Sequence, residues 1–374
     1  MPPIHDVLYE LLTTPGPSGY ERSVAKVLSA RAAQRLRMVD GARLDPSGNL
    51  HINSACFTPS RDMGRVVMLT AHMDEIGLIV QEVASNGMLH VGPIGGWDPR
   101  VVLGQRVAIQ PRDAGATAVL GVVGVKATHL MDNEEQKAAQ TLFDENVWVD
   151  IGARSDEEVY TMGVDVGDWM VLDSTPILLG QDHDVIASRA LDNRVGCYIV
   201  FRVLETLAER GSAPAVGVFT TREEIGGFGI RSAYDVISQV AAFGPRPEYC
   251  VAVDGTFATD DDSCEEDDKT RRQYGYTSLG LGPVLHRAPI LSRDVEDRLY
   301  HVAQSNDIPT QTQVIRETSG TDIDMIVDRR AQCGLVSIAM RNIHSPVEMA
   351  SLRDIDAAID LLVGFCESIY TDGI

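Results

Sequence analysis

The chain has 374 residues, of which 44% are hydrophobic and 23% charged, so it is long enough for two domains or for one large domain with an insertion. This composition excludes general disorder. The formal net charge of −22 argues against nucleic acid and against an anionic membrane surface as partners.

Two helices are predicted near the N-terminus, separated by a Pro/Gly turn in the segment PGPSGYE at 15–21. This region lacks the basic start and long apolar core of a signal peptide, and no later stretch reaches the roughly 20 apolar residues of a membrane span. The six cysteines are scattered and form no CxxC pair, which is typical of buried free thiols in a reducing compartment. We therefore predict a cytoplasmic protein.

Strands and helices alternate along most of the remaining chain. The predicted strands cover 65–71, 215–220, 249–254 and 334–340, and the predicted helices cover 193–210, about 230–241, about 293–305 and about 351–369. This alternation predicts a mainly parallel sheet covered by helices on both faces.

The pattern changes between about 75 and 175. Short runs of alternating apolar residues are separated there by Gly, Pro and Asp, which is typical of a small all-β module. We therefore predict an α/β domain formed by 1–74 and 176–374, and an inserted β domain at 75–175 whose ends lie close together.

Acidic and imidazole side chains stand at the ends of the predicted strands. In an open parallel sheet, ligands gather at the carboxyl ends of the strands, so these groups are expected to share one pocket. The group consists of His72 and Asp74 after the first strand, Asp192 at the start of the long helix, Glu223 and Glu224 after the second strand, Asp254 at the end of the third, and His344 past the last.

These residue types fit a two-metal hydrolase site. Zn²⁺ accepts imidazole and carboxylate ligands, and two ions about 3.5–4 Å apart can lower the pKa of a bound water to about 7. A shared carboxylate is the simplest bridge between the ions, and Asp192 is the candidate. Because neighbouring side chains on an extended segment point to opposite sides, one of Glu223 and Glu224 is expected to bind metal and the other to act as general base.

Six segments together resemble the M42 family of dinuclear metalloaminopeptidases, the tetrahedral aminopeptidases. They are AHMDEIGLIV, ALDNRVG, REEIGGFG, VAVDGT, SGTD and MRNIHSPVE, and the similarity extends over essentially the whole chain. The resemblance implies an αβα zinc-peptidase sandwich with an inserted, barrel-like β domain used for dimer contacts. It also implies a homo-oligomer in which dimers assemble into a dodecamer.

The resemblance further implies a role for each site residue. It places His72, Asp192 and Asp254 on one divalent ion, and Asp192, Glu224 and His344 on the other, with Zn²⁺ or Co²⁺ as the metal. Glu223 becomes the general base and Asp74 orients the His72 ring. Thr321 and Asp322 of the SGTD segment become substrate-binding residues. The implied reaction removes N-terminal residues from peptides.

Two segments depart from the family pattern. GTDIDMIVD at 320–328 places bulkier and more acidic groups beside Asp322, which affects substrate preference more than catalysis. The acidic run TDDDSCEEDD at 259–268 fits a solvated loop, or a preference for cationic N-terminal residues through its negative potential.

Other interpretations remain open at this point. Taken singly, Asp192 fits a helix N-cap and Asp254 a turn, while His129 and His183 are expected to be structural. The chain could also be a dinuclear amidase or deacylase acting on small acylated molecules, or a non-catalytic scaffold. A glycoside hydrolase would use two carboxylates about 5–9.5 Å apart, but it would need neither His72 nor His344.

Overall fold

The computed structural model describes residues 4–36, 42–54, 66–112, 116–126, 129, 147–239, 247–262, 269–329 and 331–371. The chain divides into two compact units. The first comprises Met1–Asp74, Pro176–Ile343 and Val347–Ile374, and the second comprises Glu75–Thr175 and His344–Pro346. Cys56, Cys264 and most of the acidic run, 263–268, lie outside the described residues.

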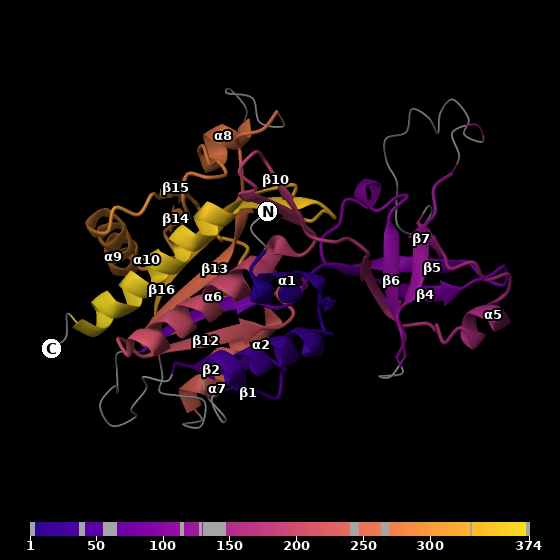
Figure 1. Ribbon diagram of the computed structural model, residues 1–374, viewed down its shortest axis with the longest axis horizontal. Coiled ribbons are helices and arrows are strands. Elements are labelled where there is room, and N and C mark those ends of the chain that lie inside the picture. The colour runs from indigo at the N-terminus through magenta and orange to yellow at the C-terminus, as the bar shows by residue number, and fades with distance from the viewer. Residues whose placement is uncertain are drawn as a thin grey trace. The chain divides into compact units, whose positions relative to one another are not determined.

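An eleven-stranded sheet forms the centre of the first unit (Figure 1). Its main path runs β1-β2-β12-β3-β13-β16-β17-β11-β10, and β14 pairs with both β15 and β16. The strands are β1 (Ala42–Leu44), β2 (Leu50–Asn53), β3 (Val67–His72), β10 (Ile177–Leu179), β11 (Val185–Ser188), β12 (Ala215–Thr220), β13 (Tyr249–Phe257), β14 (Val284–Arg287), β15 (Gln311–Val314), β16 (Gln332–Arg341) and β17 (Glu348–Ser351).

Only the centre of the main path is parallel. β12, β3, β13 and β16 pair in parallel, as expected for strands joined by helical crossovers. The flanking pairs β1/β2, β2/β12, β16/β17, β17/β11 and β11/β10 are antiparallel. The prediction of a mainly parallel sheet is therefore right for the central strands and wrong for the edges, whose three- or four-residue strands carry little periodic signal.

Helices cover both faces of this sheet. They are α1 (Asp6–Thr13), α2 (Arg22–Arg35), α6 (Leu191–Arg210), α7 (Phe228–Gln239), α8 (Lys269–Tyr274), α9 (Arg293–Ser305) and α10 (Leu352–Thr371), together with the 3₁₀ helix η4 (Asp322–Met325). In β3, Val67 and Leu69 join the core beneath α6 and α10, whereas Met68 joins the core beneath α7 and η4. Both cores are apolar, which explains the nearly continuous apolar run in this strand.

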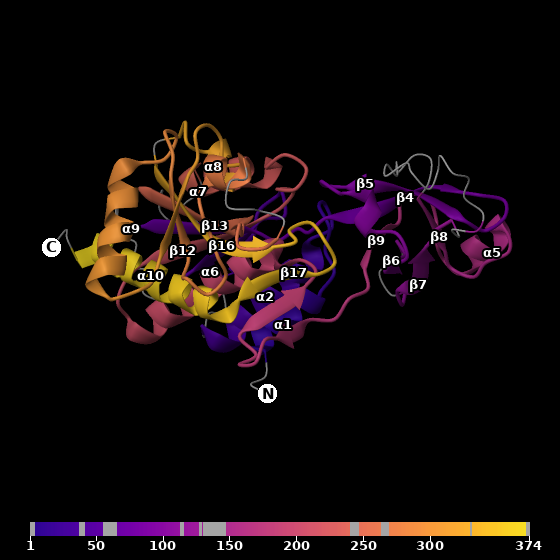
Figure 2. The same cartoon turned by 90° about the horizontal axis from the view of Figure 1, so that it is seen from above.

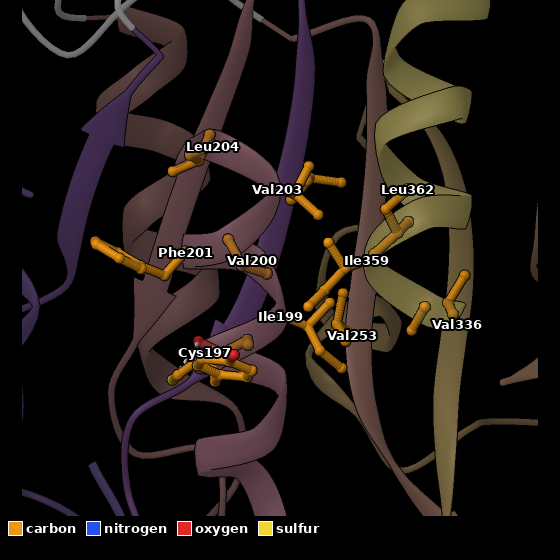
Figure 3. Close-up of a cluster of buried hydrophobic side chains, with 14 of the residues drawn as sticks. Cys197, Ile199, Val200, Phe201, Val203, Leu204, Val253, Val336, Ile359 and Leu362 are labelled. Atoms are coloured by element: carbon orange, nitrogen blue, oxygen red, sulfur yellow. Dashed lines mark hydrogen bonds between the residues drawn. The ribbon is translucent and has the colours of Figure 1, made fainter. Parts of the chain in front are cut away.

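Helix α6 fills the larger of these two cores. Ile199 and Val203 of α6 lie beside Val253 of β13 and Ile359 of α10, as Figure 3 shows. α6 also contacts α10 directly, and α10 contacts α9 (Figure 2). This packing fixes the start of α6, which carries Asp192, against the central strands.

The second unit contains a closed barrel with the order β4-β5-β8-β7-β6-β9. Its strands are β4 (Gly77–Val83), β5 (Leu89–Ile94), β6 (Arg106–Gln110), β7 (Val119–Val123), β8 (Trp148–Asp150) and β9 (Trp169–Leu172), and it also holds the 3₁₀ helix η1 (Pro99–Val101) and helix α5 (Asp156–Thr161). The barrel-like character is as predicted, and α5 is an addition to the expected all-β module. Ser155 caps the N-terminus of α5, since its side chain accepts the Glu158 N–H.

No helix in the described ranges combines the length and the apolar character that a membrane crossing requires.

Candidate metal centre

The parallel register brings two segments of the site together. β12 and β3 pair so that Thr220 lies beside His72, and each of these residues ends its strand. The residues that follow, including Glu223 and Glu224, therefore leave the sheet next to His72.

Asp254 reaches the same place from within a longer strand. The prediction that its strand ends there is wrong, because β13 continues to Phe257 along β16. β13 pairs with β3 only as far as Ala252, which lies beside Thr70. Asp254 thus lies beyond the last paired residue of β13 and β3, where its side chain can approach His72.

Asp192 comes from the first turn of α6. Its backbone is not helical, with φ −80° and ψ 106°, and its peptide bond to Asn193 is cis. The Asp192 N–H donates to Glu348 at 3.1 Å, and the Asn193 side chain donates to the Val253 carbonyl at 2.8 Å. These bonds hold the helix start against β17 and against β13, the strand that carries Asp254.

These segments converge on the imidazole of His72. Its Nε2 atom lies 3.2 Å from Asp192 Oδ1, 3.6 Å from Asp254 Oδ1 and 4.0 Å from Glu223 Oε2. One ligand atom from each of His72, Asp192 and Glu224 lies within 4.8 Å of the others, which makes these three a candidate metal-binding group among the described residues. One imidazole with several carboxylates is a donor set that suits Zn²⁺ or Co²⁺.

Asp74 contacts both His72 and the glutamate segment. The Asp74 carbonyl lies 3.1 Å from His72 Nδ1, and its Oδ1 atom lies 3.5 Å from the same nitrogen. Its two carboxylate oxygens accept the backbone N–H groups of Glu223 and Glu224, each at 3.1 Å. The hydroxyl of Ser18 donates to Oδ2 at 2.6 Å. Asp74 therefore links the histidine to both glutamates.

The crowding of acids shifts their proton affinities. Burial raises the pKa of Glu223 to about 10, assisted by Asp254 and opposed by His72. Burial and Asp192 likewise raise the pKa of Asp254, against the effect of His72. Burial acts to lower the pKa of His72, but the carboxylates of Asp192, Asp254 and Asp74 together raise it well above its usual value. A cation bound among these acids would favour their ionised forms.

The SGTD segment lies at the same end of the sheet. Asp322 begins η4 and is only 2% exposed, and its Oδ2 atom accepts the hydroxyl of Thr220 at 2.5 Å and that of Thr70 at 3.5 Å. Burial and nearby carboxylates raise the pKa of Asp322 to about 7. Its neighbour Thr321 is also buried and contacts Ser319. Through Thr220 and Thr70, Asp322 thus contacts the ends of the strands that lead to the glutamates and to His72.

The sequence also singled out three other histidines, His344 as a metal ligand and His129 and His183 as structural residues. His344 follows β16 with a φ of 60° and groups with the second unit, where its ring lies near Gly96. His183 has a φ of 54° in the loop between β10 and β11. His129 is exposed, and its neighbours in sequence lie outside the described residues. Cys197, Cys250, Cys333 and Cys366, the four cysteines within the described ranges, are buried and free.

Three residues near the glutamates were not predicted from the sequence: Ser18, Glu21 and Asn49. Each is at most 4% exposed and bonds to the segment around Glu223 or to Asp74. The only available signal was the PGPSGYE turn, which places polar residues between two apolar helices. The acidic run also begins differently from expectation, because the buried carboxylate of Asp260 pairs at 2.7 Å with Arg341, which is 31% exposed.

Comparison with known proteins identifies the family. The model of the M42 glutamyl aminopeptidase family matches residues 53–361. The lysyl aminopeptidase of Pyrococcus furiosus is 29% identical, over 97% of both chains. An aminopeptidase structure from Desulfurococcus kamchatkensis is 31% identical with a TM-score of 0.82, over 97% of this chain and 94% of that one. The Pyrococcus horikoshii TET1 peptidase, at 24% identity and a TM-score of 0.78 over 96% of this chain and 98% of that one, shares the fold. With its matched segment containing the His72 cluster, this chain is a peptide hydrolase of the M42 family.

Proposed function

We propose that this protein is a metal-dependent aminopeptidase that removes N-terminal residues from peptides, using two divalent cations and a glutamate base. The observation that carries the proposal is the convergence of Asp192, Asp254, Glu223 and Glu224 on the ring of His72. Membership of the M42 family supports the reaction class.

We infer the ligand sets from this grouping together with the family resemblance. His72, Asp192 and Asp254 would hold one Zn²⁺ or Co²⁺ ion, and Asp192, Glu224 and His344 would hold the other. The short distances from His72 to Asp192 and Asp254 support the first set. The proximity of Glu224 to Asp192 supports Asp192 as the shared ligand. Such ions, when bound, polarise a peptide carbonyl and lower the pKa of water.

The residues of the chain supply proton transfer and orientation. Glu223 Oε2 lies 4.0 Å from the ring of His72, so its carboxylate stands beside the metal-binding group. In the proposal this carboxylate takes a proton from the attacking water and passes it to the leaving amine. Asp74 keeps the ring of His72 oriented. Thr321 and Asp322 are the proposed substrate-binding residues. The Asp322 carboxylate also accepts the hydroxyls of Thr220 and Thr70, near the ends of β12 and β3.

We also propose that the protein is a homo-oligomer whose barrel unit makes the dimer contacts. Leu120, Val122 and Val125 in and after β7 are 65%, 48% and 57% exposed, and they line a hollow of about 610 Å³. Exposed apolar patches of this kind are typical of protein interfaces. The TET1 peptidase of Pyrococcus horikoshii can assemble into a tetrahedron or a large octahedral shell. A dodecamer is the assembly proposed here.

A substrate panel tests this function. Acidic, aliphatic and basic aminoacyl chromogenic substrates are assayed with Zn²⁺ or Co²⁺, each beside its N-acetylated counterpart. An aminopeptidase cleaves only the substrates with a free amine, and a chelator abolishes the activity. Cleavage of the acetylated set alone would instead favour a deacylase, and activity on a β-glucan that survives the chelator would favour a glycoside hydrolase.

The base is tested by Glu223→Gln, with Glu82→Gln on the exposed surface of β4 as its control. We expect Glu223→Gln to lower kcat by about 10²–10⁴-fold with metal content retained. The control keeps full activity. A Glu223→Gln variant with unchanged kcat would exclude Glu223 as the base.

A further inference from the structure

Four consecutive backbone amides at the start of the glutamate turn, from Thr221 to Glu224, each donate to a buried side chain. Thr221 donates to Asn49 Oδ1 at 3.0 Å, and Arg222 donates to Glu21 Oε1 at 3.0 Å. Glu223 and Glu224 donate to the two oxygens of Asp74, each at 3.1 Å. Buried amides need partners, and a turn normally finds them in its own backbone or in water. Here three side chains from the first 74 residues provide all of them.

The backbone of this segment has an unusual conformation. Arg222 has a φ of 59°, a left-handed conformation that costs a residue with a Cβ free energy unless its surroundings hold it in place. The bond from its N–H to Glu21 is one of the contacts that hold it. The conformation of Arg222 sets the direction in which the next two residues, Glu223 and Glu224, leave the sheet.

The side chains of Glu21 and Asn49 are themselves anchored. Glu21 Oε1 also accepts the Gly19 N–H at 2.7 Å. The Asn49 amide donates to Asp45 at 2.7 Å and to the Gly229 carbonyl at 3.0 Å, so Asn49 joins the beginning of the turn to its end. Gly229 leaves no room for a substitute at that contact, since an added Cβ would stand 2.6 Å from Asn49 Oδ1. With exposures of 4% for Glu21 and 0% for Asn49, neither side chain is free to adopt other rotamers in solvent.

We propose that Glu21 and Asn49 are positioning residues of the reaction. With Asp74 they fix the backbone from Thr221 to Glu224, so that the Glu223 carboxylate stays beside His72 and the Glu224 carboxylate stays in the metal-binding group. This inference rests on the proposed function, because the fixed geometry matters only if Glu223 transfers the proton and Glu224 binds a cation. Glu21 and Asn49 contact the backbone of the turn and act through it. Because Glu223 and Glu224 are adjacent on this turn, a small rotation of its backbone would move both carboxylates at once.

Two substitutions at Glu21 separate the effect of side-chain length from the effect of charge. Glu21→Gln keeps an oxygen at the same distance and removes the charge, whereas Glu21→Asp keeps the charge but is one methylene too short for the Arg222 N–H. We expect Glu21→Asp to lower kcat by about 10–100-fold, the range seen when a supporting hydrogen bond of a metal site is lost, with KM within about twofold. Glu21→Gln is expected to retain most of kcat. Glu205→Asp is the matched control, since Glu205 of α6 is similarly buried and pairs with the Arg35 side chain.

A second variant tests the other end of the turn. Asn49→Asp keeps an oxygen that accepts from Thr221 but loses the donor to Asp45 and to the Gly229 carbonyl, and it places a second carboxylate beside Asp45. We therefore expect kcat to fall in the same range while KM changes little. Thermal unfolding confirms that each variant is folded at the assay temperature. If Glu21→Asp remains fully active, or if Glu21→Gln is the more damaged of the pair, Glu21 has no positioning role.

The same assays include Glu223→Gln, so that failure of the proposed function can be distinguished from failure of the positioning inference. A Glu223→Gln variant with unchanged kcat overturns the glutamate base of the proposed function, on which the positioning inference rests. An inactive Glu223→Gln variant together with unaffected Glu21→Asp and Asn49→Asp variants overturns only the positioning inference.

Discussion

The Nε2 atom of His72 lies 3.2 Å from Oδ1 of Asp192, although one residue ends a strand and the other starts a helix far along the chain. Both are largely buried, with side-chain exposures of 2% and 13%. Packing of α6 against β3 and β13 maintains this approach, since α6 contacts both strands. The central parallel strands and α6 therefore act as a rigid support for the proposed metal centre.

Replacing Asp74 tests the link between the histidine and the glutamates. The backbone N–H groups of Glu223 and Glu224 each donate to one carboxylate oxygen of Asp74. In Asp74→Asn one of these oxygens becomes an NH₂ group, which cannot accept the N–H that faces it. We expect kcat to fall by about 10–100-fold, as for other residues that orient metal ligands. Steady-state assays measure this, with Asp173→Asn on the barrel surface as control. An Asp74→Asn enzyme with the control's kcat would show that the link is dispensable.

Arg194 is predicted to be essential for stability. It is fully buried in α6 and donates to the carbonyls of Leu11, Thr14 and Gly16. A buried polar group left without its partner costs about 1–3 kcal/mol, and three carbonyls lose their donor, so Arg194→Met should lower the free energy of unfolding by about 3 kcal/mol or more.

Denaturant unfolding measures the effect, and Arg210→Met is the control. Arg210 forms an exposed pair with Glu367, for which we expect a loss of less than about 1 kcal/mol. Equal losses for the two variants would mean that the hydrogen bonds from Arg194 to the carbonyls of α1 and the turn after it do not stabilise the fold.

The sequence predicts those parts of the fold that carry a strong local pattern. Helix α9 spans 293–305 and β12 spans 215–220, as expected from their periodicity and their flanking turns. The edge strands were missed because strands as short as Ala42–Leu44 do not show a distinct period.

In the candidate site, too, only the residues that belong to a local sequence pattern could be predicted. His72, Asp192 and the two glutamates could be predicted because metal-type side chains follow apolar strands or begin a helix at the carboxyl end of the sheet. Glu21 and Asn49 could not, because they bind backbone amides of a segment far along the chain. No property of a side chain at 221–224 indicates that its N–H will need a distant acceptor.

Acid stability is predicted to depend on His286. Burial lowers the pKa of this β14 residue to about 3, and its Nε2 atom lies 2.8 Å from the Ser337 hydroxyl. Since the unfolded chain takes up a proton near pH 6.5 and the folded chain does not, His286 destabilises the fold progressively as pH falls from about 6.5 toward 3.

His286→Gln should therefore reduce the loss of unfolding free energy between pH 7 and pH 5 by about 2 kcal/mol. Denaturant unfolding at the two pH values measures it. Ser337→Ala, which removes the hydrogen-bond partner but keeps the imidazole, should retain the pH dependence of the unmodified protein. A His286→Gln protein with that same dependence would contradict the prediction.

The barrel unit provides a test of assembly. Leu120→Asp combined with Val122→Asp places two charges on the exposed apolar face of β7, which should disfavour a buried contact. Size-exclusion chromatography with light scattering is expected to show a smaller particle than the unmodified protein. Tyr160→Asp, at an exposed position of α5 in the same unit, controls for added surface charge. An unchanged particle mass in the double variant would place the subunit contacts elsewhere.

Elemental analysis of the purified protein tests the central claim most directly. The protein is saturated with Zn²⁺, freed of unbound metal and compared with Asp192→Asn, in which the proposed shared ligand is replaced. We predict two ions per chain in the unmodified protein and at most one in the variant. Absence of stoichiometric metal in the unmodified protein, or two ions in both proteins, would contradict a metal pair held through Asp192.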